Sequence, residues 1–293
     1  MTEQFLFGGE IVWKPTPEHI EHANLTAFMR AHGIKDFAEL MHRSTSDVAW
    51  FTDAVLKYLD IQFYEPYTKA VDLSDGIQFP KWCVDGKMNI VHNCVDKWVG
   101  VCVGAGFIPA PVPTQEEPLH NGRPHPQGAL RGSPLQNAVI FEGEEGITRT
   151  LTYEELYKEV NKAANALRSL GLGKGDAIGI FMPMTPEIVI ALLAIAKIGG
   201  IILPLFSGYG AGAILSRLQD ADAKALFASD GAFRRGKAVE MKSIADEAAE
   251  QVSSLKHMIV LKRTGQDVKM KAGRDHWWHA LIVPQLDTAS TEI

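Results

Sequence analysis

The sequence predicts an α/β protein in which a helical N-terminal region is followed by a mostly parallel sheet with helices on both faces. Short apolar runs at residues 177–181, 201–206 and 223–229 have the length of buried strands. The stretches between them, 186–196 and 211–220, have the length of helices. From its third residue onward the first of these stretches is entirely apolar, which indicates a helix without a solvated face. This alternation is typical of parallel βαβ units.

Turn and capping residues mark the ends of these elements. Pro186 suits the first turn of a helix, and the pair Gly199-Gly200 follows its end. Thr152 and Glu155 have the spacing of a capping box, in which a hydroxyl and a carboxylate satisfy N–H groups at a helix start. We therefore expect another helix to begin just after Thr152.

Further elements complete the α/β part. We expect a strand at 138–141, a turn at 143–146, an acidic helix at 243–252 and a fourth strand at 257–261. Residues 276–279 suggest a short helix whose adjacent tryptophans close the edge of the core.

The first 104 residues predict a separate helical region. We expect a helix at 18–32 and two helices within 37–59, the second beginning near Asp47. A short helix is predicted to follow Asn89.

Composition divides the chain into three parts. Residues 1–104 form the helical N-terminal part, and residues 138–293 form the α/β part. Residues 105–137 lie between them, are rich in proline and glycine, and show no periodicity, which is typical of an extended loop or linker.

Overall composition sets limits on function. The chain has 293 residues, of which 46% are hydrophobic and 22% are charged, as in ordinary globular proteins. The net charge is −6 and the isoelectric point is near 5.9, which argues against a partner such as nucleic acid bound through an overall positive field. Any anion site must therefore be a local basic cluster.

Cysteine usage predicts a reducing, cytoplasmic location. Cys83, Cys94 and Cys102 are too few for a disulfide scaffold and lack the spacing of metal ligands. His92 lies between two of them without completing a zinc pattern, so we interpret it as a structural histidine and predict no metal.

The apolar run at 177–206 could be mistaken for a membrane span. Pro183, Pro186, Glu187 and Lys197 divide it into pieces well below the ~20 apolar residues that a span requires. The N-terminus has no basic segment followed by a long apolar core, so it is not a secretory signal. We predict no membrane partner.

Ligands of parallel sheets bind beyond the carboxyl ends of the strands. In this sequence the corresponding segments are 207–211 and 230–237. The second contains Arg234, Arg235 and Lys237, the kind of local basic cluster that an anion would need.

Four separated segments carry a family resemblance, and the similarity as a whole extends over most of the chain outside the linker. They are WKPTPEHIEHANLTAFMR at 13–30, WCVDGKMNIVHNCVDKW at 82–98, TYEELYKEVNKAANALRSLGLGKGDAIGIFMPMTPE at 152–187 and GRDHWW at 273–278. The last three resemble acyl-CoA synthetases of the adenylate-forming (AMP-binding) superfamily, most closely the acetyl-CoA synthetase group. The first resembles the start of acetoacetyl-CoA synthetases within that group.

The resemblance implies a ligase that uses ATP with Mg and CoA as substrates. Such enzymes convert a small carboxylate and ATP to an acyl-adenylate and pyrophosphate, and then transfer the acyl group to the CoA thiol. Their adenylation chemistry uses a Ser/Thr/Gly-rich phosphate loop with a lysine, acidic residues, a ribose-binding aspartate and a further lysine on a mobile domain. The segment GLGKGDA at 171–177 is no substitute, because no Ser or Thr follows its lysine and a strand comes next.

None of the adenylation motifs has a counterpart in this sequence. We therefore expect an N-terminal fragment, truncated before the phosphate loop, that has no catalytic residues or bound cofactor of its own and is inactive alone. An uncovered sheet edge in such a fragment would favour self-association.

The resemblance also implies part of a CoA site. In the family, a glycine after the second strand and an Arg-x-Gly-Arg turn hold the CoA nucleotide and its 3′-phosphate. Gly208 corresponds to that glycine, and Arg234, Arg235, Gly236 and Lys237 correspond to the turn. Lysine replaces the final arginine, which exchanges a bidentate guanidinium for a flexible point charge.

Two alternatives remain open at this stage. Gly208, Gly210 and Ala213 fit a dinucleotide-binding pattern, with Asp230 as the candidate ribose ligand. The chain could instead be a non-catalytic module that docks to a partner supplying the missing half.

Overall fold

The computed structural model describes residues 13–99 and 137–293. The linker predicted at 105–137 lies outside the described residues except for Asn137, and Cys102 lies outside them as well. No helix in the described part of the chain is long and apolar enough to cross a membrane.

Two compact units contain the described residues. The first contains residues 13–61 and 67–86, and the second contains residues 62–66, 87–99 and 137–293. Each unit has a core of its own.

The first unit combines helices with one hairpin. Its elements are α1 (Pro17–Glu21), α2 (Asn24–Ala31), α3 (Phe37–Ser46), α4 (Val48–Tyr58), β1 (Lys69–Asp72) and β2 (Lys81–Val84). The single helix predicted at 18–32 is wrong, because Ala23 adopts an extended backbone (φ −69°, ψ 135°) that separates α1 from α2. The antiparallel hairpin of β1 and β2 was not predicted.

The two helices predicted within 37–59 are confirmed. Asp47 begins α4, and its side chain accepts a hydrogen bond of 2.9 Å from the Trp50 amide. Phe28 packs in the core of this unit, with edge contacts to Phe51 (6.1 Å between ring centroids) and Tyr58 (5.1 Å).

The second unit is built on a five-stranded parallel sheet. In the order of the sheet its strands are β11 (Asp275–Trp277), β10 (His257–Leu261), β7 (Ala225–Ser229), β5 (Ala177–Ile180) and β6 (Ile201–Pro204). The four predicted strands are confirmed, and β11 is additional.

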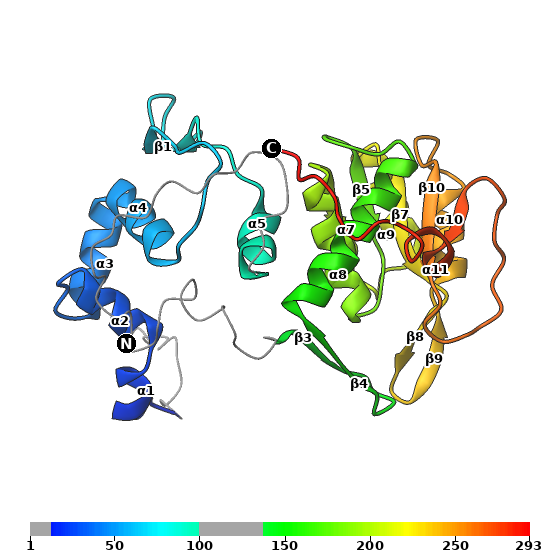
Figure 1. Ribbon diagram of the computed structural model, residues 1–293, viewed down its shortest axis with the longest axis horizontal. Helices are drawn as coiled ribbons and strands as arrows, with labels where there is room; N and C mark the ends of the chain where they lie inside the picture. Colours follow the sequence, from blue (N-terminus) through cyan, green and yellow to red (C-terminus); the bar gives the residue numbers. More distant parts are fainter. Residues whose placement is uncertain (1–12, 100–136) are drawn as a thin grey trace, which may run out of the picture. The chain divides into compact units, whose positions relative to one another are not determined.

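The helices and hairpins of the second unit surround this sheet. They are α5 (Ile90–Cys94), the 3₁₀ turn η1 (Asp96–Trp98), β3 (Asn137–Glu142), β4 (Thr148–Thr152), α7 (Tyr153–Ser169), α8 (Pro186–Lys197), α9 (Ala211–Asp220), β8 (Gly231–Arg234), β9 (Lys237–Glu240), α10 (Lys242–Ala249) and α11 (Trp278–Leu281). Figure 1 shows α7 and α8 together on one side of the strands. The strands β4, β8 and β9 were not predicted.

Successive residues of each strand face opposite cores. Along β7, Ala225 and Phe227 pack in the core that contains α7 and α8, whereas Leu226 and Ala228 pack in the core that contains α9 and α10. The predicted arrangement of helices on both faces is therefore confirmed. The helix α8 is buried on most of its surface, with Leu192 (39% exposed) as its main exception.

The short helix predicted at 276–279 is partly wrong. His276 and Trp277 belong to β11, whose backbone extends the sheet beside β10, and helical structure begins only at Trp278. Trp277 packs against the core on one face, and Trp278 is buried in the core on the other, 5.7 Å from Phe227. The pairing of β11 with β10 places adjacent tryptophans on opposite faces.

The helix α7 begins as predicted. Thr152 and Glu155 form the capping box, and Leu156, Val160 and Leu167 are buried along one side of the helix. Its other side holds the segment 286–293, for which the sequence showed no core pattern.

Side chains of α7 donate to main-chain oxygens of this segment. Asn165 Nδ2 donates to the carbonyls of Leu286 and Thr288, both at 2.9 Å, and Asn161 donates to the carbonyl of Asp287 at 2.8 Å. Arg168 donates to a fourth carbonyl, at Ser290. Figure 1 draws this segment in red where it passes α7.

Candidate functional site

The chain leaves the middle of the sheet in opposite directions. From β5 it runs through α8 to β6 on one side, and from β7 it runs through α10 to β10 on the other. Adjacent strands whose connections diverge in this way create a crevice at their carboxyl ends, where parallel sheets bind ligands. The segment 230–241, which includes β8 and β9, begins at this point.

The predicted basic turn is the tip of the β8–β9 hairpin. Arg234 and Lys237 are the last paired residues of the two strands. Arg235 (φ 52°) and Gly236 (φ 72°) form the turn between them, both in the left-handed region. All four residues are exposed. The structure thus places three cationic side chains and a glycine amide together at one tip.

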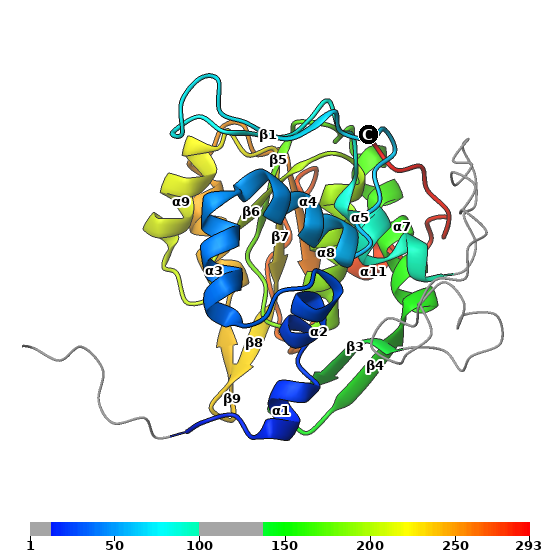
Figure 2. The same cartoon turned by 90° about the vertical axis from the view of Figure 1, so that its left-hand side faces the viewer.

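A second hairpin reaches the same tip. Figures 1 and 2 both show the β3–β4 and β8–β9 hairpins extending from the same end of the sheet. The Gly236 amide donates to Glu144 Oε2 at 3.3 Å, and Glu144 lies in the turn of the β3–β4 hairpin. The sequence did not predict this contact.

Arg263 holds the two hairpins together. Its guanidinium lies 4.9 Å from the ring centroid of Phe233 on β8 and 5.7 Å from that of Phe141 on β3. Arg263 also forms an ion pair with Glu145, and the two side chains are 17% and 19% exposed. A backbone hydrogen bond within Glu145 and the bond from Arg263 hold the pKa of that carboxyl below its usual range.

Gly208 lies in the exposed turn after β6, on the other side of β5 from the basic turn. A Cβ atom at Gly208 would lie 2.6 Å from the Phe206 ring. Phe206, 63% exposed, meets Tyr209 edge to face at 5.7 Å, and Arg217 lies over the Tyr209 ring. Gly208 therefore adjoins an aromatic surface at the same edge of the sheet.

Asp230 is not available to a ribose. Its carboxylate is completely buried and accepts hydrogen bonds from the amides of Gly231, Arg263, Thr264 and Gly265 at 2.7 to 3.0 Å. These bonds fix the loop after β10 to the end of β7.

The rest of the dinucleotide pattern has no special geometry. Gly210 precedes α9 with an extended backbone (φ −78°, ψ 167°), a conformation open to any residue, and the Ala213 amide donates to its carbonyl. Without Asp230, the pattern Gly208, Gly210 and Ala213 lacks a ribose ligand.

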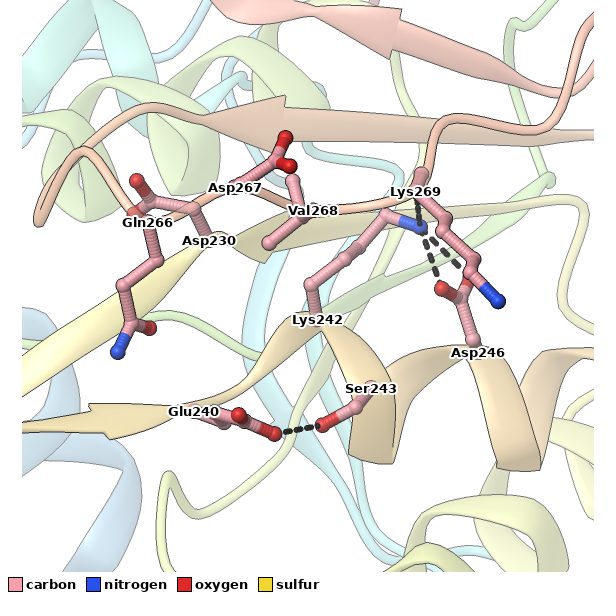
Figure 3. A pocket seen from close by; sticks show the side chains of 9 residues that line it. All are labelled: Asp230, Glu240, Lys242, Ser243, Asp246, Gln266, Asp267, Val268 and Lys269. Carbon is pink, nitrogen blue, oxygen red and sulfur yellow. Dashed lines mark hydrogen bonds and ion pairs between the residues drawn. The ribbon is translucent and has the colours of Figure 1, made fainter.

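An acidic cavity lies at the base of the β8–β9 hairpin. Its volume is about 510 Å³. Figure 3 shows the lining side chains, which are Asp230, Glu240, Lys242, Ser243, Asp246, Gln266, Asp267, Val268 and Lys269. Acidic side chains outnumber basic ones here, so the cavity does not suit a phosphate.

The buried cation of this cavity already has partners. Lys242, 1% exposed, donates to Asp246 at 2.7 Å and to Asp275 at 2.8 Å. Burial alone would raise the pKa of the Asp275 carboxyl, but hydrogen bonds from Arg274 and Lys242 hold it below its ordinary value. This cluster is a structural ion network.

The residues considered for a metal do not form a site. The ring of His92 is hydrogen-bonded to Gln62 at 2.9 Å, and Cys83 and Cys94 are free thiols. Within residues 13–99 and 137–293, no group of three or more His, Cys, Asp or Glu side chains could hold a metal ion.

Two profiles of known protein families match the sequence of this chain. The sequence profile described as AMP-binding enzyme matches residues 128–290, more than half of the chain. The chain belongs to the AMP-binding enzyme family. A second profile, described as acetyl-coenzyme A synthetase N-terminus, matches residues 37–94.

Relatives of this AMP-binding chain include acetyl-coenzyme A synthetases. That of Methanothrix thermoacetophila is 37% identical over 280 residues, which cover 94% of this chain and 37% of the relative. That of Mycolicibacterium smegmatis is 36% identical over 281 residues, which cover 96% of this chain and 25% of the relative. The chain therefore spans 25% to 37% of the lengths of these relatives.

A solved structure shares the fold. Acetoacetyl-CoA synthetase from Streptomyces lividans superimposes with a TM-score of 0.75 at 22% identity, over 96% of this chain and 39% of that protein. The likeness supports the architecture of this AMP-binding chain and not the roles of its residues.

Sequence reasoning missed Arg263 and Glu144. Arg263 follows the carboxyl end of β10 by two residues, so the rule that selected 230–237 could have selected it as well. Glu144 had no such signal, because its contact with Gly236 joins residues 92 positions apart.

Proposed function

We propose that this chain is the N-terminal portion of an ATP-dependent short-chain acyl-CoA synthetase and that it carries part of the CoA site. The observation that carries the proposal is the exposed basic turn at the carboxyl edge of an AMP-binding sheet. The proposal includes the three-part division into residues 1–104, 105–137 and 138–293.

The residues of the turn have distinct roles in this proposal. Arg234 binds the 3′-phosphate of CoA through two parallel N–H donors, and Lys237 adds a point charge beside it. The left-handed backbone of Arg235 and Gly236 presents amide groups in the manner of an anion-binding nest. Gly208 leaves room for the nucleotide next to Phe206 and Tyr209.

The adenylation half-reaction is not assigned to this chain. The phosphate loop and its lysine have no counterpart among the 293 residues, so the ATP, Mg and carboxylate sites are not placed on the residues described here. The purified chain is expected to release no pyrophosphate from ATP in the presence of acetate, propionate or acetoacetate. Pyrophosphate release above that of a buffer control would contradict this part.

The proposal also includes a cellular compartment and self-association of the chain. The free thiols of Cys83 and Cys94 support a reducing compartment such as the cytoplasm. The strand β6 ends the sheet with Ile201, 56% exposed, so size-exclusion chromatography is expected to show concentration-dependent self-association.

Calorimetry with CoA and dephospho-CoA tests the CoA site. The chain is expected to bind CoA more tightly, because only CoA has the 3′-phosphate. Arg234→Ala should weaken CoA binding about 10- to 100-fold and leave dephospho-CoA binding unchanged, since a charge-assisted hydrogen bond contributes about 1.5–3 kcal/mol. Lys158→Ala, which removes an exposed cation from α7, is the matched control. Equal affinity of the unmodified chain for both ligands would overturn the site.

A further inference from the structure

We infer that Glu144 is an internal competitor for the anion-binding turn between β8 and β9, and that a phosphate group must displace it to bind there. For CoA as the ligand, the inference rests on the proposed function. The contact between Glu144 and the turn stands independently of it.

The contact itself places a carboxylate where an anion would bind. The Gly236 amide donates to Glu144 Oε2 at 3.3 Å. With Arg235 and Gly236 in the left-handed region, this amide belongs to a turn whose N–H groups suit an anion. Carboxylate and phosphate oxygens accept the same kind of hydrogen bond, so they compete for one donor.

A neighbouring ion pair fixes Glu144 at this place. Glu145, the next residue, pairs with Arg263, and Arg263 lies against one aromatic ring from each hairpin. Gly143 provides the space for this pair, because a Cβ atom there would lie 2.6 Å from Glu145 Oε2. The β3–β4 turn is therefore anchored beside the β8–β9 turn, and Glu144 does not depend on its own weak bond to stay there.

The negative charge of Glu144 also opposes the binding of a phosphate at this turn. The tip carries the exposed cations Arg234, Arg235 and Lys237, and Glu144 places one negative charge among them. An incoming phosphate therefore meets a smaller positive field than the three cations alone would create. Removal of Glu144 should raise the affinity for a phosphate monoester and should not affect a ligand without one.

Calorimetry on two matched variants tests this prediction. Glu144→Ala is expected to bind CoA about 2- to 5-fold more tightly than the unmodified chain, the size typical of one exposed charge contact, with dephospho-CoA unchanged. Glu142→Ala removes a carboxylate from the same hairpin at an exposed position. It should change CoA affinity by much less. Equal effects of the two variants, or no tightening by Glu144→Ala, would overturn the inference.

A second measurement separates this inference from the CoA assignment. Glycine-selective ¹⁵N labelling reduces the NMR spectrum to the 26 glycines of the chain, and the Gly236 signal is identified by its loss in Gly236→Ala. Inorganic phosphate should shift this signal at lower concentration in Glu144→Ala than in the unmodified chain. If both respond at the same concentration, Glu144 is no competitor. If Glu144→Ala lowers the phosphate concentration needed but the chain shows no preference for CoA over dephospho-CoA, the proposed CoA site is wrong. The inference that Glu144 competes with phosphate then still stands.

Discussion

Lys237 is the position at which the basic turn departs from the Arg-x-Gly-Arg pattern that the family resemblance implies. It pairs with Arg234 across the end of the hairpin, so the two side chains leave neighbouring backbone positions. A lysine ammonium offers a point charge, whereas a guanidinium offers a planar pair of donors that match phosphate oxygens.

Lys237→Arg is therefore expected to tighten CoA binding about 3- to 10-fold, with little change for dephospho-CoA. Calorimetry with both ligands measures the difference. Arg235→Lys is the comparison, because it replaces a guanidinium by an ammonium at a position within the turn itself. Loss of CoA binding in Lys237→Arg would show that the lysine is needed for its shorter reach.

His257 gives the second unit a pH dependence. Its Nδ1 lies 3.3 Å from Nε2 of His276 on the neighbouring strand. Burial, and then the nearby His276, lower the pKa of His257 below its ordinary value. The unfolded chain, with a histidine pKa of about 6.5, therefore binds a proton more readily than the folded chain.

The stability that neutral His257 contributes is present above about pH 6.5 and is lost as the pH falls below that value. His257→Gln should lose less stability than the unmodified chain between pH 7.5 and pH 5. Urea unfolding at a series of pH values measures this. Parallel stability curves for the two proteins would show that His257 binds protons equally well in the folded and unfolded chains.

At the level of elements, one buried ion pair joins η1 to the end of α8. Lys197 Nζ lies 3.1 Å and 3.2 Å from the two carboxylate oxygens of Asp96, and the lysine side chain is 1% exposed. Burial lowers the pKa of Lys197, and Asp96 opposes that effect. Within the described part of the chain, the lysine charge therefore depends on this carboxylate and on the nearby Tyr157 ring.

Asp96→Asn should reduce the free energy of unfolding by about 3 kcal/mol, because it leaves a buried ammonium without its counter-charge. The double variant Asp96→Asn and Lys197→Met should recover part of the loss. Denaturant unfolding of the three proteins gives the values. A loss below about 1 kcal/mol in the single variant would mean that water already solvates the pair.

The elements that could be predicted were those with strong local signals. The strands β5, β7 and β10 are short apolar runs, and α9 was predicted with its observed limits. The helix predicted at 18–32 failed because a local bend at Ala23 leaves little trace in apolar spacing. The strand β11 is only three residues long and is stabilised by pairing with β10, whereas β8 and β9 are four residues each and are stabilised by pairing with each other. The pattern within a single strand does not record this pairing.

In the candidate site too, features with a local sequence signal could be predicted and features that depend on tertiary contacts could not. The basic turn at Arg234 to Lys237 could be predicted because it follows a buried strand and contains its own chemistry. Glu144 could not be predicted, because its importance comes from a contact with Gly236, 92 residues away. Arg263 could have been selected by its place after β10, but its contact with Glu145, 118 residues away, leaves no local signal. Asp230 fitted the dinucleotide alternative in the sequence because its burial under the loop after β10 is a tertiary property.

At the scale of the whole second unit, the segment 286–293 is attached to α7 by polar side chains of that helix. Asn165→Ala removes two hydrogen bonds, to the carbonyls of Leu286 and Thr288. We expect a loss of about 1 kcal/mol and faster amide hydrogen exchange in this segment. Thr288→Ala is the control, because its exposed side chain makes none of these bonds. Equal exchange in both variants would show that the segment is held by other contacts.

Every one of these attachments ends on a peptide oxygen. The bonds from Asn161, Asn165 and Arg168 go to the main-chain carbonyl, a group that all twenty amino acids share. They therefore fix the path of the segment whatever its side chains are. Residues 287, 288 and 290 can therefore be exchanged for others that allow the same path, for example to introduce a fluorescent label. The three donors on α7 have no such freedom, since Asn161 and Arg168 must each reach one particular oxygen and Asn165 must reach two.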